Sequence, residues 1–173
     1  MKIRYGFVSN SSSSSFLVVF PSIPSSVEET KTLLFGDNDL YPNPYPWNDV
    51  PNSWLAKNVA EIVFYDIQTQ LDQHGPLSDE EAMDTGTSGR LDAKYPEYPQ
   101  PTSYAENDWE MYDEYYKKCN DVNREVVREF LDSNIKHSPV LKFEYSDNDG
   151  VLSAAMEHGD LFSRLKHLKI SKH

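Results

Sequence analysis

Acidic and histidine side chains are concentrated near the C-terminus. Between residue 147 and the end of the chain lie Asp147, Asp149, Glu157, His158, His167 and His173. Carboxylate and imidazole groups bind divalent metals and also act as general acids and bases. The candidate catalytic residues are therefore Asp147, Asp149, Glu157 and His158. The candidate metal ligands are Asp147, Asp149, His158, His167 and His173, and a divalent metal is the candidate cofactor.

The spacing of these residues matches no known metal motif. Placing Gly150 in the glycine position of an EF-hand loop puts Tyr145 at the first ligand position and Met156 at the twelfth. Neither His158 nor His167 is followed by a second histidine at i+4, so the paired histidines of a zincin helix are missing. The commonest use of an Asp-Asn-Asp-Gly segment is a hydrophilic turn. We therefore favour a turn over residues 147–150 with surface histidines, and keep an acid/histidine site as the alternative.

A polar run precedes the apolar segment 16–20, and its candidate anion-binding residues are Ser9, Asn10, Ser11, Ser12 and Ser13. Clustered hydroxyl and backbone N–H groups can cradle an anion or a phosphate. Phosphate loops usually carry glycine and lysine, and neither occurs between Val8 and Ser15. Serine and asparagine side chains also bond to their own neighbouring backbone. We therefore favour an ordered loop over an anion site.

Other catalytic patterns are missing from the sequence. It contains no Gly-x-Ser-x-Gly, Walker or Rossmann motif. Cys119 is the single cysteine, which excludes an intramolecular disulfide and a cysteine-rich zinc site. The sequence leaves open whether the protein is an enzyme.

Both ends of the chain carry short motifs. The N-terminal segment 6–16 reads GFVSNSSSSSF, and the C-terminal part contains SDNDG at 146–150, MEH at 156–158 and SKH at 171–173. These features resemble a group of uncharacterised phage and bacterial proteins with this N-terminal signature and with SDNDG, MEH and SxH motifs near the C-terminus. The resemblance covers about the first 20 and the last 30 residues. It implies a phage or bacterial origin and brings no activity with it.

Composition and charge limit the classes of function. A chain of 173 residues with 38% hydrophobic content is long enough for one ordinary domain, so we expect a single domain over 1–173, with 37–52 and 85–104 as long loops or insertions. The net charge of −12 is concentrated in residues 77–132. A strongly acidic surface disfavours general nucleic-acid binding and leaves open a basic partner or mimicry of an acidic one. We expect a protein partner. The oligomeric state is left open.

The apolar segments fall short of a signal peptide or a membrane span. We therefore expect no membrane association and a soluble protein in a reducing cytoplasm, of a bacterium or of a phage-infected cell. Association with a virion is a further possibility under the phage resemblance.

Hydrophobic periodicity predicts a mixed α+β fold. The expected strands are 16–20, 140–146 and 166–171, and the expected helices are 26–34, 53–73, a short one from residue 78, 105–131 and 151–158. The segment 16–20 is almost wholly apolar and so belongs at the centre of a small sheet, between the other two strands. The prolines of the first aromatic and proline-rich loop, 37–52, forbid a helix interior and a central strand there. We expect its aromatic residues to pin the loop to the domain, and a recognition surface is the alternative.

Two functions from different classes follow. The favoured one is a phage-like, non-enzymatic accessory protein that binds a partner through an acidic, aromatic-rich surface. The alternative is a small metal-dependent hydrolase or phosphate-handling or nucleotide-handling enzyme that uses the C-terminal acid/histidine cluster and the N-terminal serine loop. The alternative requires those two regions to meet at one end of the sheet.

Overall fold

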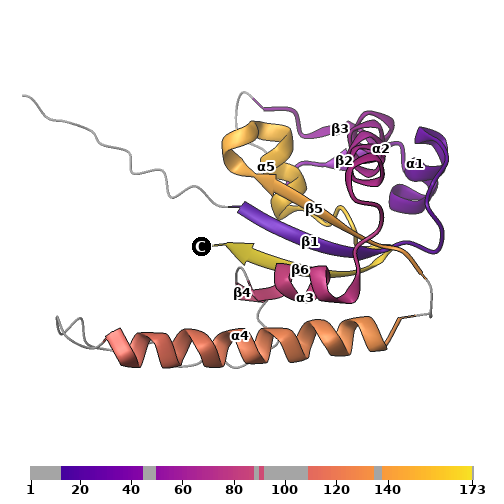
Figure 1. The fold of residues 1–173 in the computed structure, drawn as a ribbon. Helices are drawn as coiled ribbons and strands as arrows, with labels where there is room; N and C mark the ends of the chain where they lie inside the picture. The colour runs from indigo at the N-terminus through magenta and orange to yellow at the C-terminus, as the bar shows by residue number, and fades with distance from the viewer. Residues whose placement is uncertain (1–12, 45–49, 88–89, 92–108, 135–137, 173) are drawn as a thin grey trace, which may run out of the picture.

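The computed structural model describes residues 13–44, 50–87, 90–91, 109–134 and 138–172, and Figure 1 shows the fold. The helices are α1 (Val27–Phe35), α2 (Ala56–Gln73), α3 (Asp79–Thr87), α4 (Trp109–Asp132) and α5 (Val151–His158). The strands are β1 (Ser13–Val19), β2 (Leu40–Pro42), β3 (Ser53–Leu55), β4 (Arg90–Leu91), β5 (Val140–Ser146) and β6 (Lys166–Lys172), and a 3-10 turn, η1 (Asp147–Asp149), follows β5. The predicted α+β class is confirmed.

The three predicted strands form the core of one antiparallel sheet. Its strand order is β4-β6-β1-β5, so β1 lies between the two strands that the sequence placed beside it. Phe16 of β1 faces Phe143 of β5 on one side and Lys169 of β6 on the other. All residues of β1 from Ser14 to Val19 are buried. Burial of both faces explains why this segment reads as a continuous apolar run.

Helices cover both faces of the sheet, in two layers (Figure 1). Successive strand residues point to opposite faces, so β1 contributes to two hydrophobic clusters. Phe16 and Val18 pack with residues of α1, α2 and α5, whereas Leu17 and Val19 pack with residues of α3 and α4. The central strand therefore holds the two helical layers together.

Helix ends follow the capping signals of the sequence. The Ser26 hydroxyl accepts a hydrogen bond from Glu29 N at 3.2 Å at the start of α1, and Gly36 ends that helix with a φ of 59°. At α3, Ser78 and Glu81 bond reciprocally: Ser78 N donates to Glu81 Oε2 at 2.9 Å. This arrangement is a capping box. Both predicted helix starts are confirmed.

The predicted start of the second helix at residue 53 is wrong by three residues. Residues Ser53–Leu55 form β3 instead, which pairs antiparallel with β2. The helix begins at Ala56, whose N–H donates to Asp39 O at 2.8 Å. Backbone hydrogen bonds between β3 and the preceding β2 therefore keep residues 53–55 extended, despite the helical spacing of the apolar residues in this segment.

The loop 37–52 is pinned to the domain by Tyr41, as expected. Tyr41 is buried, and its hydroxyl donates to Ala155 O of α5 at 2.8 Å. Tyr45 and Trp47 lie outside the described residues. In the second predicted loop, 85–104, α3 continues to Thr87 and residues 90–91 form β4, while 92–104 lie outside the described residues.

Candidate functional site

The structure places the described members of the predicted C-terminal set on three different elements. Asp147 and Asp149 lie on η1 and are exposed, Glu157 and His158 form the last turn of α5, and His167 is an exposed residue of β6. His173 lies outside the described residues, as do Ser9, Asn10, Ser11 and Ser12 of the predicted anion site. Ser13 is the first residue of β1 and pairs with Ser146 and Lys172, so it belongs to the sheet rather than to a loop.

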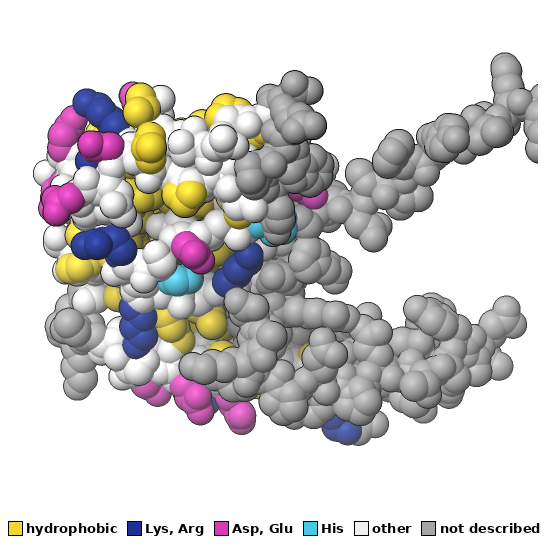
Figure 2. Space-filling model, turned by 180° about the vertical axis from the view of Figure 1, so that it is seen from behind, with side chains coloured by type: hydrophobic (Ala, Val, Ile, Leu, Met, Phe, Trp, Pro, Cys, Tyr) yellow, Lys and Arg dark blue, Asp and Glu magenta, His cyan; other side chains and the backbone are white. Residues whose placement is uncertain are grey.

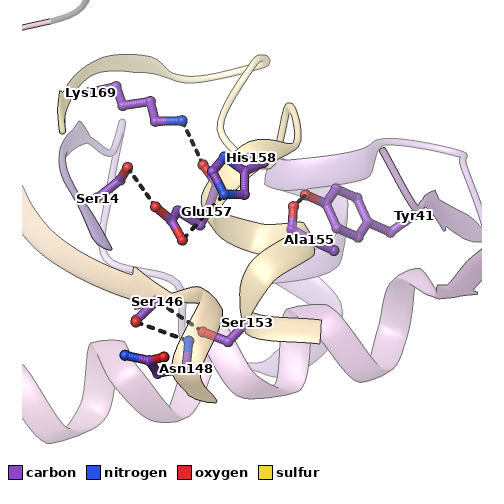
Figure 3. Close-up of polar contacts among 9 residues, drawn as sticks. All are labelled: Ser14, Tyr41, Ser146, Asn148, Ser153, Ala155, Glu157, His158 and Lys169. Carbon is purple, nitrogen blue, oxygen red and sulfur yellow. Dashed lines mark hydrogen bonds and ion pairs between the residues drawn. The ribbon is translucent and has the colours of Figure 1, made fainter. Parts of the chain in front are cut away.

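Glu157 is the centre of a buried polar cluster that joins three elements (Figure 3). Its side chain is fully buried, and the Ser14 hydroxyl of β1 donates to Glu157 Oε1 at 3.3 Å. His158 Nε2 lies 3.5 Å from Glu157 Oε2, and Lys169 of β6 donates from Nζ to the Glu157 carbonyl oxygen at 2.7 Å. Among the described residues, Glu157 Oε2 has no hydrogen-bond partner.

This polar cluster brings together two of the predicted site residues, Glu157 and His158, and adds Ser14 of the serine run. In the part of the chain that the structure describes, no three His, Cys, Asp or Glu side chains gather as a metal site would require. The buried carboxyl group ties β1 to the end of α5, and burial of a polar group is costly without hydrogen-bond partners. Its position on the inner side of the helix fits a structural role.

The residues around Asp147 and Asp149 form the predicted hydrophilic turn. The Ser146 hydroxyl accepts from Asn148 N at 3.2 Å, and Ser146 N donates to the Ser153 hydroxyl at 3.1 Å (Figure 3). Gly150 has a φ of 102°, which is open to glycine and costly for other residues. The segment thus connects β5 to α5 within a few residues.

A groove of about 880 Å³ lies between α2, α3, β5 and α5. Its apolar lining includes Ile62, Leu77, Phe143, Leu152 and Met156. Its size is within the range of pockets that hold small ligands. No sequence pattern predicted this groove, because its walls come from segments far apart in the chain.

The charged lining of the groove is mainly acidic. It comprises the carboxylates of Asp66, Glu81, Glu144 and Asp149, together with Lys142 and His74. Lys142 Nζ lies 3.4 Å from Glu144 Oε2, so the lysine is paired with one of those carboxylates. On the face shown in Figure 2, by contrast, acidic and basic side chains are interspersed over the described part. The groove is therefore a place where a cationic group would be attracted.

Asp66 and Tyr145 form the one tyrosine–carboxylate hydrogen bond described in this groove. The Tyr145 hydroxyl donates to Asp66 Oδ2 at 3.1 Å. Burial raises the pKa of Asp66, while the hydrogen bond from Tyr145 opposes this rise. Burial also raises the pKa of Tyr145, with the negative charge of Asp66 as a further cause. Tyr145 is thus the hydrogen-bond donor of this pair, and Asp66 is the acceptor.

Hydrogen bonds from a side chain of α2 and from the backbone of Leu77 satisfy part of the backbone of β5 along the groove. β5 is an edge strand of the sheet, and an exposed edge is a template for further pairing. Lys142 N donates to Gln70 Oε1 at 3.1 Å, and Val140 O accepts from Leu77 N at 2.9 Å. These bonds occupy part of the backbone edge of β5. A ligand in the groove would therefore contact side chains more than unpaired backbone groups of this strand.

Asp66 was not among the residues that the sequence singled out. The helical stripe of α2 predicted its buried face, where Val59, Val63 and Ile67 are fully buried. Asp66 directly precedes Ile67 in the sequence. A carboxylate beside a core position was the one signal in the sequence that α2 has a polar side next to its buried face.

No protein family, curated protein or solved structure matches this chain. In the described part of the chain, none of the helices combines the length and the apolar character that crossing a bilayer demands.

Proposed function

We propose that this protein is a non-enzymatic binding protein whose groove accepts an extended, basic segment of a partner protein. The observation that carries the proposal is the combination of an apolar lining with four carboxylates in one groove. Apolar side chains of a partner would gain from burial there, and its cationic side chains would gain from the negative potential.

The charge of the whole chain supports the same kind of partner. The net charge of −12 attracts basic segments over a distance set by the ionic strength. Electrostatic attraction of this kind mainly raises the association rate, and the apolar contacts then slow dissociation. We expect the affinity to fall as salt is added.

The alternative, a small metal-dependent hydrolase, has one observation in its favour. The Ser14 hydroxyl of β1 donates to Glu157 Oε1, and Glu157 Oε2 lies 3.5 Å from His158 Nε2, so one serine of the run lies beside one residue of the predicted C-terminal cluster. The meeting point is a fully buried carboxylate on the inner side of α5. We rank this function second because a substrate would have to reach that buried group.

Origin and location stay predictions from the sequence. The phage or bacterial group, the cytoplasmic location and an association with virions rest on the end motifs and on composition. A cytoplasmic accessory protein that captures a basic segment is consistent with the proposed groove.

The proposal is tested by selecting peptides from a yeast-displayed library of random short sequences on the full chain. We expect enrichment of peptides that combine basic with apolar residues, and a loss of their affinity in Ile62→Arg, which adds bulk and a positive charge to the groove. Leu40→Arg is the matched control, because Leu40 is an exposed apolar residue on β2 outside the groove lining. Fluorescence anisotropy of a selected peptide that carries a label measures its affinity for the native chain and for both variants.

A library that yields no binding peptide overturns the proposal. So does a selected peptide that binds Ile62→Arg as tightly as the native chain.

A further inference from the structure

We infer that Asp66, oriented by Tyr145, is the subsite that binds a lysine or arginine side chain of the segment held in the groove. This inference rests on the proposed function and names the residue that would determine specificity within it.

Tyr145 fixes the position of the Asp66 carboxylate. The Tyr145 ring is buried among aromatic neighbours, with its centroid 6.2 Å from that of Phe16 and 6.5 Å from that of Phe143. Its hydroxyl donates to Asp66 Oδ2 at 3.1 Å. A donor on a rigid core side chain limits the rotamers of the carboxylate, so less conformational entropy is lost when a ligand binds.

The hydrogen bond with Tyr145 leaves acceptor capacity on Asp66. An ionised carboxylate has two oxygens and about four lone-pair positions. Among the described residues, the Tyr145 hydroxyl is the one hydrogen-bond donor to the Asp66 side chain. A carboxylate that lines a groove with this spare capacity fits an ammonium or a guanidinium group, which carry several N–H donors and no acceptor.

A lysine of the groove lining is already paired with a carboxylate. Lys142, the one lysine described in the groove lining, lies 3.4 Å from Glu144 through its Nζ atom. Asp66 is also partly removed from water, so its charge is less screened than that of an exposed carboxylate. A cation from a partner would replace lost hydration and form a charge-assisted hydrogen bond.

Neighbouring polar side chains of α2 extend the subsite. Thr69, Gln70 and Gln73 line the same groove within two turns of Asp66. The Gln70 side-chain oxygen already accepts from Lys142 N, and its amide N–H groups can donate to carbonyl groups of an extended segment. α2 thus offers a carboxylate for a basic side chain and, beside it, amide groups that can bind the backbone of the partner segment.

The test uses a peptide selected on the native chain. Each lysine or arginine of this peptide is replaced in turn by its neutral isostere, norleucine or citrulline. On the native chain we expect one position to lose about tenfold in affinity, the scale of a hydrogen bond between charged groups. Asp66→Asn should bind the unmodified peptide about tenfold more weakly than the native chain does. This variant should bind the peptide with the neutral residue at that position as tightly as it binds the unmodified peptide.

Asp66→Asn keeps an oxygen acceptor for Tyr145 and removes the charge, so it is a conservative change. Asp149→Asn is the matched control, because it makes the same chemical change at another carboxylate of the groove lining. The control should keep the position-specific loss. Far-ultraviolet circular dichroism of each variant checks its fold.

The outcomes separate the inference from the proposed function. If peptides bind, Ile62→Arg blocks them and Asp66→Asn retains the same position-specific loss, then the Asp66 subsite is overturned and the groove stands. If Asp149→Asn abolishes the position-specific loss as Asp66→Asn does, general electrostatics explains binding and the subsite is also overturned. If no peptide binds, both proposals fail.

Discussion

Among the described residues, the carboxyl side chains of Glu157 and Asp66 are both withdrawn from water, and they differ in what surrounds them. Glu157 is fully buried, with Ser14 and His158 at its two oxygens. Asp66 lines an open groove and has a fully packed tyrosine behind it. A carboxylate enclosed by its own chain holds elements together, whereas one at a groove is available to a ligand.

The raised pKa of Asp66 predicts a pH-dependent cost to stability. At low pH the carboxyl is protonated in both states and has no effect. As pH rises, the unfolded chain releases its proton first, so the free energy of unfolding falls until the pH passes the pKa of the folded state. Asp66→Asn removes this cost, so its stability relative to the native chain should increase from about pH 3 to about pH 7.

Urea unfolding at both pH values measures this difference. Glu29→Gln is a control of opposite sign, because hydrogen bonds from Ser25 lower the pKa of Glu29. A depressed pKa stabilises the folded state above the unfolded value, so this variant should lose relative stability over the same range. An Asp66→Asn difference that is constant with pH would contradict the prediction.

At the scale of elements, α3 and α4 approach each other closely at a glycine. A Cβ atom added to Gly86 would lie 2.3 Å from Val127 Cγ2, and Val127 is fully buried. Real carbon atoms do not approach so closely, so a side chain at Gly86 would push the helices apart. This glycine therefore lets the layer below the sheet pack tightly.

Gly86→Ala should destabilise the protein in the native background. Overpacking costs about 1–3 kcal/mol, and the better helix propensity of alanine returns up to about 1 kcal/mol. In a Val127→Ala background the space exists, so the same substitution should become neutral or stabilising. Thermal or urea unfolding of the four chains measures this reversal; equal losses in both backgrounds would show that the contact with Val127 is not the cause.

At the scale of the whole molecule, β1 joins the two helical layers, because its residues belong to both hydrophobic clusters. Phe16 and Leu17 are neighbours in sequence and lie in different hydrophobic clusters. A loss of packing at either residue should therefore affect both layers, as expected for cooperative unfolding.

Leu17→Ala is predicted to lower the free energy of unfolding by about 2–5 kcal/mol, because Leu17 is fully buried and would leave a cavity. Leu40→Ala is the matched control: Leu40 is 55% exposed, and its loss should cost about 0.5 kcal/mol or less. Hydrogen exchange should show that α2 and α3 lose protection together in Leu17→Ala. Loss of protection in α3 alone would mean that the two layers unfold independently.

The sequence by itself determined the class of fold and much of its order. The apolar run ending at Phe20 required a strand buried on both faces, and Ser26 and Ser78 marked helix starts through local hydrogen bonds. These features are local, since burial, period and capping depend on residues within a few positions of each other. The Asp147–Gly150 turn was predictable for the same reason.

Only the tertiary structure decided the candidate site. Tyr145 and Asp66 are 79 residues apart, and Ser14 and Glu157 are 143 residues apart. Each pair meets because the antiparallel register of β1 and β5 and the packing of α2 and α5 on one face fix their positions. A sequence pattern reports which face of an element is buried, but it does not report which distant element covers that face. The groove is therefore a property of the packed chain, and no single segment of the sequence contains it.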